Sequence, residues 1–162
     1  MRSTALDLAR ALAMTPLALL PLLASPAAAD PPPDADAIAE HMGFLGYQCD
    51  RKPVGLHCRH EQHVDVSVRG IQGGTLLVTY FATEDAAKAP ERRLGVLELV
   101  NTMNAHSASV IFFIDGEGDL GASTWFPGGY DRTRFGQILE RWNVDLREAL
   151  QRDPEASKAL IR

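Results

Sequence analysis

Polar and apolar positions alternate with unusual regularity between residues 56 and 69. Every odd-numbered position of this stretch is polar, and the even-numbered positions at its two ends are apolar. Because successive side chains of a strand point to opposite faces, a period of two predicts one long strand with a single solvent-facing side. Two strands joined by a bulge near Glu61 and Gln62 would give the same pattern.

Shorter patterns predict the remaining strands. Residues 44–50 predict the first strand, and residues 75–82, which are apolar on both faces, predict another. A hairpin is expected from residues 107–115 and 119–126, because Gly116-Glu117-Gly118 separates two runs of strand-forming side chains.

Three helices are expected between or beside these strands. One of them lies in residues 91–106, where apolar side chains recur at i, i+3, i+4 and i+7: Val96, Leu99, Val100 and Met103. A short helix is expected before Gly43, and a last helix is expected to begin after Asp131 and to end at Asp153-Pro154.

The order of these elements is α-β-β-β-α-β-β-α, which predicts the α+β class. Strands joined by hairpins form antiparallel sheets, so we expect a sheet of about five strands with the helices packed on one face. Residues 37–152 then form a single domain. A proline-rich lead-in, 30–36, precedes it, and a loose C-terminal tail, 153–162, follows it.

One block of residues resembles the YbjN-like family. Residues 97–105 contain N-x-x-N on a helix, and residues 110–115 form an aromatic strand. A D-x-x-G-D-L turn follows at Asp115, then Trp125, and a closing helix that carries Trp142. The likeness is best over residues 94–146 and looser over residues 37–82. It implies a fold similar to the type III secretion chaperones and a non-enzymatic regulator without established catalytic residues.

The first 29 residues are organised as a secretory signal peptide. Arg2 and Arg10 give a positive start, residues 11–24 are uncharged and rich in leucine, and Ala27-Ala28-Ala29 supplies small residues before the cut. An apolar run of this length is shorter than the roughly 20 residues that span a bilayer. We therefore expect residues 1–29 to be cleaved, the mature chain to be periplasmic or secreted, and no membrane insertion after cleavage. Members of the resembled family are commonly cytoplasmic, so export departs from that family.

The charge balance disfavours polyanionic partners. The leader holds two of the 16 basic and one of the 21 acidic residues, which leaves 14 basic against 20 acidic side chains and a net charge of −6 in the mature chain. Nonspecific binding to nucleic acid or to anionic lipid requires the opposite sign. No nucleic-acid partner is therefore expected.

Cys49 and Cys58 are the only cysteines of the sequence, and we expect them to form a disulfide. A lone pair in an oxidising compartment is usually bridged. Between them, Lys52-Pro53-Val54-Gly55 has the composition of a tight turn. Counting outward from Lys52 opposite Gly55 places the two cysteines opposite each other in neighbouring strands. A redox-active pair is the alternative, although the spacing is not C-x-x-C.

A group of potential metal ligands lies within the alternating stretch: His57, Cys58, His60, His63 and Asp65. In a strand, His60 points away from His57 and His63, which lie about 20 Å apart at roughly 3.3 Å per residue. One metal ion with bonds of about 2 Å cannot join them. No metal site and no cofactor are therefore predicted, although a bulge at Glu61 would bring part of the group together.

Two other polar groups have residue types that occur in binding sites or helix caps. Asp115, Glu117 and Asp119 have the early spacing of a calcium loop, but the distal glutamate is missing, so a hairpin turn is favoured. On the preceding helix, Asn104 is expected to cap the passage into the next strand, and Asn101 to be exposed.

Nothing in the sequence marks a catalytic group. There is no G-x-S-x-G motif, the cysteines are expected to be bridged, and no base stands at a fixed offset from a serine. The chain is therefore expected not to be an enzyme.

Apolar surface is the remaining functional signal. In the second hairpin, Trp125 points to the face opposite Leu120, Ala122, Thr124 and Phe126, and we expect the latter set to face the helices. The other face would then bind a protein partner or a second copy of the chain through Trp125 and Tyr80. The alternatives are that loop 83–90 covers this face, or that the chain binds a small molecule or metal on the polar strand face around His57 and His63.

Overall fold

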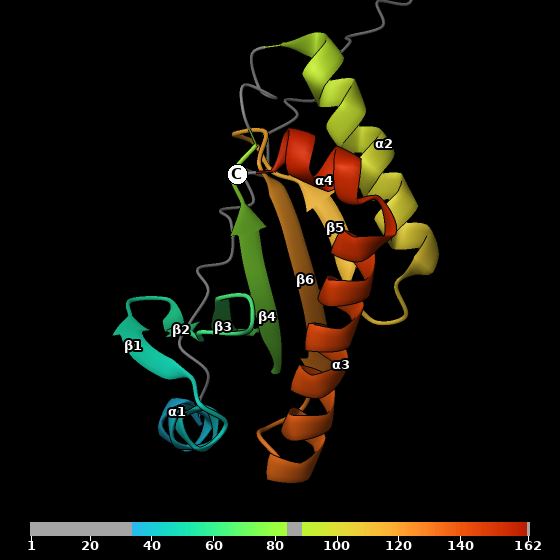
Figure 1. Cartoon of the computed structure of the whole chain (residues 1–162). Helices are drawn as coiled ribbons and strands as arrows, with labels where there is room; N and C mark the ends of the chain where they lie inside the picture. Colours follow the sequence, from blue (N-terminus) through green and yellow to red (C-terminus); the bar gives the residue numbers. More distant parts are fainter. Residues whose placement is uncertain (1–33, 84–88, 162) are drawn as a thin grey trace, which may run out of the picture.

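The computed structural model describes residues 34–83 and 89–161 (Figure 1). Two groups of elements occur along the chain. The first comprises α1 (Ala35–Phe44), β1 (Gln48–Lys52), β2 (Gly55–Arg59), β3 (Val66–Ile71) and β4 (Gly74–Phe81). The second comprises α2 (Pro90–His106), β5 (Ile111–Ile114), β6 (Leu120–Pro127), α3 (Arg132–Arg152) and α4 (Pro154–Leu160). The signal peptide expected at 1–29 and the prolines of the lead-in lie outside the described residues.

The six strands form one antiparallel sheet in the order β1-β2-β3-β4-β6-β5. Figure 1 shows α3 and α4 running beside β5 and β6, with α2 behind them and α1 close to β1. Side chains of all four helices contribute to, or pack against, one hydrophobic core. The α+β class and the antiparallel sheet are confirmed.

The alternating stretch 56–69 is two strands rather than one, and this accounts for the sixth strand. Its central residues, 60–65, leave the ladder because local side-chain hydrogen bonds replace strand pairing. The backbone N–H of His60 donates to the Asp65 carboxylate at 3.4 Å, and the backbone N–H of Gln62 donates to Nδ1 of His60 at 2.9 Å. The first strand also begins later than expected, because α1 continues to Phe44.

The C-terminal residues expected to form a loose tail are ordered as α4. The Asp153 carboxylate accepts a hydrogen bond from the backbone N–H of Ala156 at 3.0 Å and so caps this helix. Ala156 and Leu160 pack against the core, and Ile161 pairs with Thr83 in an isolated bridge. The helix is short, and no long apolar stripe marks it in the sequence.

The sheet faces divide as expected for the second hairpin. Phe112, Leu120, Ala122, Thr124 and Phe126 are buried on the helix-covered side, where they pack with Phe135, Leu139 and Trp142 of α3. Because side chains alternate along each strand, Tyr80, Trp125 and Ile111 stand on the side without helices.

A buried carboxylate joins α3 to the loop between α2 and β5. Oδ2 of Asp145 accepts hydrogen bonds from the backbone N–H and hydroxyl of Ser109, both at 2.8 Å, and from the hydroxyl of Ser107 at 3.2 Å. Its Oδ1 lies 2.7 Å from the Arg141 guanidinium. Burial by itself would raise the pKa of this carboxyl, but the serine hydrogen bonds and Arg141 outweigh burial and lower it. The start of β5 is therefore fixed by α3.

Removing the charge of Asp145 should destabilise the whole domain. We expect Asp145→Asn to reduce the free energy of unfolding by about 2–3 kcal/mol, because the buried Val110 N–H and the part-buried donors of Ser107 and Ser109 lose a charged acceptor. Urea denaturation measures the loss. Glu148→Gln, at an exposed position of the same helix, is the control and should change stability by less than about 0.5 kcal/mol.

The same carboxyl should make stability depend on pH. Since its pKa is lower in the folded than in the unfolded chain, its contribution is fully present above the unfolded value of about 3.9 and is lost as the pH falls through the folded value. Wild type should lose more stability than Asp145→Asn between pH 5 and acid pH. Parallel stability curves for the two proteins would contradict this assignment.

The expected disulfide joins β1 to β2. Cys49 lies opposite Cys58 in the antiparallel register, and Lys52 lies opposite Gly55, as the turn predicts. The cysteine Cα atoms are 4.0 Å apart, and Cys58 is fully buried against the core. The bridge closes the outer hairpin of the sheet.

Reducing this disulfide should weaken the fold by an amount that its loop length sets. For a sequence separation of 9, the chain-entropy model gives about 2.5–3 kcal/mol. Unfolding of wild type in the presence of dithiothreitol should show this loss. The double variant Cys49→Ser with Cys58→Ser should be equally weak with and without the reductant, and a response of that variant would refute the explanation.

Candidate functional site

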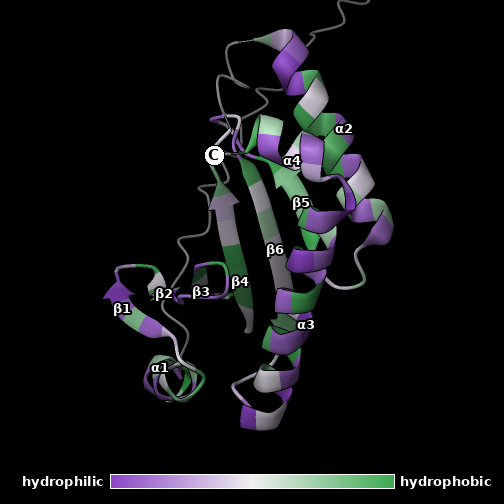
Figure 2. Ribbon diagram, viewed as in Figure 1, coloured by the Kyte–Doolittle hydropathy of each residue, from purple (hydrophilic) through white to green (hydrophobic). Residues whose placement is uncertain are grey.

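A patch of large apolar side chains lies on the side of the sheet without helices. We call it the apolar sheet face, and it comprises Leu76, Val78 and Tyr80 of β4, Ile111 and Phe113 of β5, and Trp125 of β6. Ile111 is 65% exposed, Trp125 48% and Tyr80 46%. Figure 2 shows green along β4 and β5, whereas most of β1 is purple.

The indole of Trp125 is held against the sheet. Its indole N–H donates a hydrogen bond to the carbonyl oxygen of Ile71 at 3.2 Å. A methyl group at Gly74 would collide with the indole ring, so the absence of a side chain there lets the ring approach the backbone. One side of the indole is therefore covered by the sheet, and the other is open to solvent.

The ring of Phe113 packs over a glycine in the same way at the other end of the apolar sheet face. Its ring covers Gly121, where an added Cβ would stand closer to three ring carbons than van der Waals contact allows. Tyr80 meets this ring edge-on, with the centroids 6.0 Å apart and the planes at 90°. The two glycines thus seat two aromatic rings that are fixed before any partner binds.

The apolar sheet face ends at β3, where polar side chains begin. Arg69 lies opposite Leu76, and Ser67 lies opposite Val78. Beyond them, Nδ1 of His57 is 3.5 Å from the Ser67 hydroxyl, and Nε2 of His57 is 3.9 Å from the Asp65 carboxylate. One half of this side is therefore apolar and the other half, over β1 to β3, is polar.

The outer edge of β5 is closed by the helix that precedes it. The backbone N–H of Phe112 donates to Oδ1 of Asn104 at 2.8 Å, and Nδ2 of Asn104 donates to the Phe112 carbonyl at 2.9 Å. These two groups would otherwise be open to another strand. Asn104 was expected to cap the passage from the helix to the strand; its side chain instead bonds to Phe112 within β5, and Ser107 is the C-cap of α2. Asn101 is exposed as expected.

The histidines do not lie as a strand would place them. Because 60–65 is a loop, the rings of His60 and His63 come together, with centroids 4.4 Å apart, and both approach Tyr47. The expectation that His60 points away from His63 is wrong. His57 instead faces Ser67 on the side without helices. Within residues 34–83 and 89–161, no three potential ligands gather as a metal centre.

The acidic residues at 115–119 form a hairpin turn, as the sequence predicts. Oδ1 of Asp115 accepts hydrogen bonds from the backbone N–H groups of Glu117 and Asp119, both at 2.9 Å. Asp119 in turn accepts from the backbone N–H of Thr83 at 2.9 Å. These carboxylates shape the turn and tie it to the end of β4.

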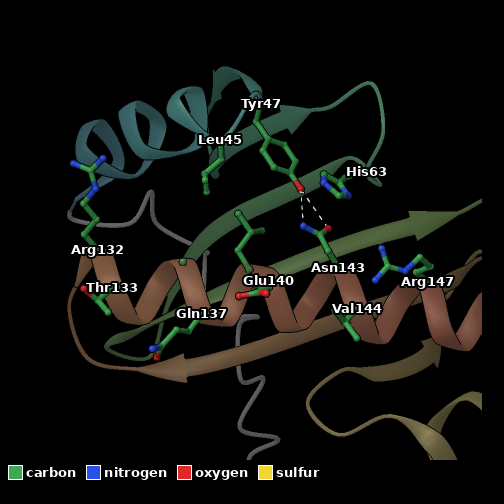
Figure 3. Close-up of a pocket in the computed structure, with 12 residues that line it drawn as sticks. Leu45, Tyr47, His63, Arg132, Thr133, Gln137, Glu140, Asn143, Val144 and Arg147 are labelled. Atoms are coloured by element: carbon green, nitrogen blue, oxygen red, sulfur yellow. Dashed lines mark hydrogen bonds between the residues drawn. The ribbon is translucent and has the colours of Figure 1, made fainter.

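Sequence reasoning missed a cleft of about 640 Å³ beside α3, on the helix-covered side (Figure 3). Its polar centre is the hydroxyl of Tyr47, which lies 3.3 Å from Oδ1 and 3.1 Å from Nδ2 of Asn143. Burial raises the pKa of Tyr47, so the hydroxyl stays protonated. The two residues are 96 positions apart, and no local pattern links them.

Comparison with known proteins supports the fold. No family model and no curated protein matches this sequence. The structure is similar to that of YbjN from E. coli, a protein described as a candidate transcription regulator. The TM-score is 0.62 and the sequence identity 16%, over 78% of this chain and 94% of the YbjN chain. Across the part of the chain that the structure describes, no helix has the length and apolar character needed to cross a bilayer. The chain has a YbjN-like fold.

Proposed function

We propose that this chain is an exported, non-enzymatic binding module that holds a protein partner on its apolar sheet face. One observation carries the proposal: three large apolar side chains, Tyr80, Ile111 and Trp125, are each about half exposed or more on one face. Contiguous apolar surface of this kind usually marks an interaction site in a soluble domain.

The composition of the face supports a protein partner. Tryptophan and tyrosine are the residues that most often dominate binding energy at protein interfaces. Because the indole of Trp125 and the ring of Phe113 are already held in place, binding would cost little side-chain entropy. The formal net charge of −5 favours a protein over a nucleic acid as the partner, and a second copy of the chain is one candidate.

Export is supported by the leader pattern of residues 1–29 and by the Cys49–Cys58 disulfide. Disulfides persist in oxidising compartments such as the periplasm and the extracellular space. The description of YbjN as a candidate transcription regulator does not transfer to an exported, acidic chain. We therefore place the binding function in the cell envelope or outside the cell.

The polar alternative around His57 and His63 has less support. These two histidines line different hollows, since His57 faces Ser67 whereas His63 contacts Tyr47 near α3. A single ligand on one polar strand face would not reach both.

The proposal predicts that a charged side chain on the apolar sheet face weakens association. Ile111→Asp and Trp125→Asp should each weaken self-association or partner capture at least tenfold, because a buried, unpaired carboxylate opposes the contact. Sedimentation of the mature chain measures self-association. Quantitative crosslinking in the cell envelope measures partner capture.

Leu94→Asp is the matched control, since Leu94 is 58% exposed but lies on α2. It should leave both measurements unchanged. Full association of Ile111→Asp, the more exposed position, would refute the proposal even if Trp125→Asp proved unstable. So would equal losses in all three variants.

A second variant tests the shape of the face without adding charge. Gly121→Ala should displace the Phe113 ring, cost about 1–2 kcal/mol in unfolding free energy, and weaken association. Gly116→Ala is the control, because an added Cβ there meets no atom within 4 Å. In a Phe113→Ala background, Gly121→Ala should cost much less, and an undiminished cost would show that the ring is not the obstacle.

A further inference from the structure

The cleft beside α3 lies on the opposite side of the sheet from the apolar sheet face, so it forms a separate candidate site. One stripe of α3 forms one wall, and Leu45, Tyr47 and His63 stand across from it (Figure 3). Its volume of about 640 Å³ lies within the range of roughly 300–1,000 Å³ that is usual for small-molecule sites.

Hydrogen-bond donors gather at one end of this cleft. Tyr47 is only 4% exposed, and its hydroxyl contacts the Asn143 amide, which fixes that side chain. Arg147 follows Asn143 by one helical turn and lines the same end. Among the described residues, no carboxylate forms an ion pair with Arg147. Its guanidinium can therefore bind an anion in two parallel hydrogen bonds.

His63 stands across from these groups. Burial lowers the pKa of the His63 imidazole, and the neighbouring His60 and Arg147 lower it further. The ring is therefore neutral at pH 7 and offers an N–H donor without a second positive charge. One acidic residue, Asp65, also lies near the Arg147 end of the cleft. It is close enough for its negative charge to contribute to the raised pKa of Tyr47.

Apolar side chains also line the cleft. Leu45 is 39% exposed on one wall, Val144 is half-buried on the other, and Leu139 is buried between them. Glu140 also lines the cleft, one helical turn before Asn143 and two turns, or about 10 Å along the axis, before Arg147. The Arg147 end, where the Asn143 amide and the His63 ring also lie, can therefore bind an anion from which an apolar group extends, and Arg132 lines the opposite end of the cleft.

We propose that this cleft binds an amphiphilic carboxylate, with the acid group at Arg147 and Asn143 and the apolar part along Leu45 and Val144. The chemistry fits both a free apolar acid and the C-terminal carboxylate of a peptide. In either case the guanidinium supplies the charge, the Asn143 amide and the His63 N–H supply further donors, and the apolar wall selects against small hydrophilic acids.

Titration of the mature protein with matched probes tests the site. Octanoate is compared with octanamide, which has the same chain without the charge, and a hydrophobic pentapeptide with a free C-terminus is compared with its C-terminal amide. Backbone and side-chain NMR shifts report binding at Asn143 and His63. We expect octanoate, the free peptide, or both to bind at least tenfold more tightly than their amides. Binding of only one probe identifies the source of the carboxylate.

Substitution of the guanidinium completes the test. Arg147→Gln should weaken binding of the acid at least tenfold, whereas Arg152→Gln, on the same helix but outside the cleft, should not. Equal binding of acids and amides, equal effects of the two arginine variants, or no shift with any probe would each overturn the proposal. Trp125→Asp should keep wild-type affinity for the acid, which separates this site from the proposed protein-binding face.

Discussion

The hydrogen bonds that Asp145 accepts set the position of β5, and much of the molecule depends on that position. The carboxylate of one helix holds the loop between α2 and β5 through Ser107 and Ser109, so the strand begins at a defined point against the sheet. The register of β5 then places Ile111 and Phe113 beside Tyr80 and Trp125. If the loop were free to shift by one residue, these two side chains would exchange faces with Phe112 and Ile114. A buried carboxylate thus determines which side chains the helix-free surface presents.

The sequence predicted those parts of the structure that depend on residues within one hairpin. The strong alternation of the second hairpin placed Trp125 on the side without helices, and the short turn between the cysteines determined their register. The alternating pattern predicted a strand at 60–65, where the structure has a loop. The polar side chains of His60 and Asp65 accept hydrogen bonds from nearby backbone N–H groups in place of strand pairing. The short helix α4 was not predicted, because its stability comes from contacts with distant residues rather than from a long apolar stripe.

The two candidate sites differ in how visible they are in the sequence. The apolar sheet face follows from period-two patterns within single strands. The cleft depends on Tyr47 and Asn143, which meet only after the sheet and α3 have packed together. One signal for the buried carboxylate was present, since Asp145 interrupts the apolar spacing of Trp142, Leu146 and Ala149 on α3. A charged residue at such a position indicates a buried polar contact even when its partner cannot be identified.

The closed edge of β5 limits how copies of this chain can assemble. The sheet formed by the described residues has two edge strands, β1 and β5. Endless edge-to-edge pairing of such sheets requires both edges to accept a strand from a neighbouring molecule. Asn104 occupies the outward groups of Phe112 on one of these strands. Another strand would therefore find no free donor or acceptor at Phe112, which opposes strand-to-strand pairing along β5. The bonds of Asn104 thereby oppose pairing along this edge, while the apolar sheet face remains exposed.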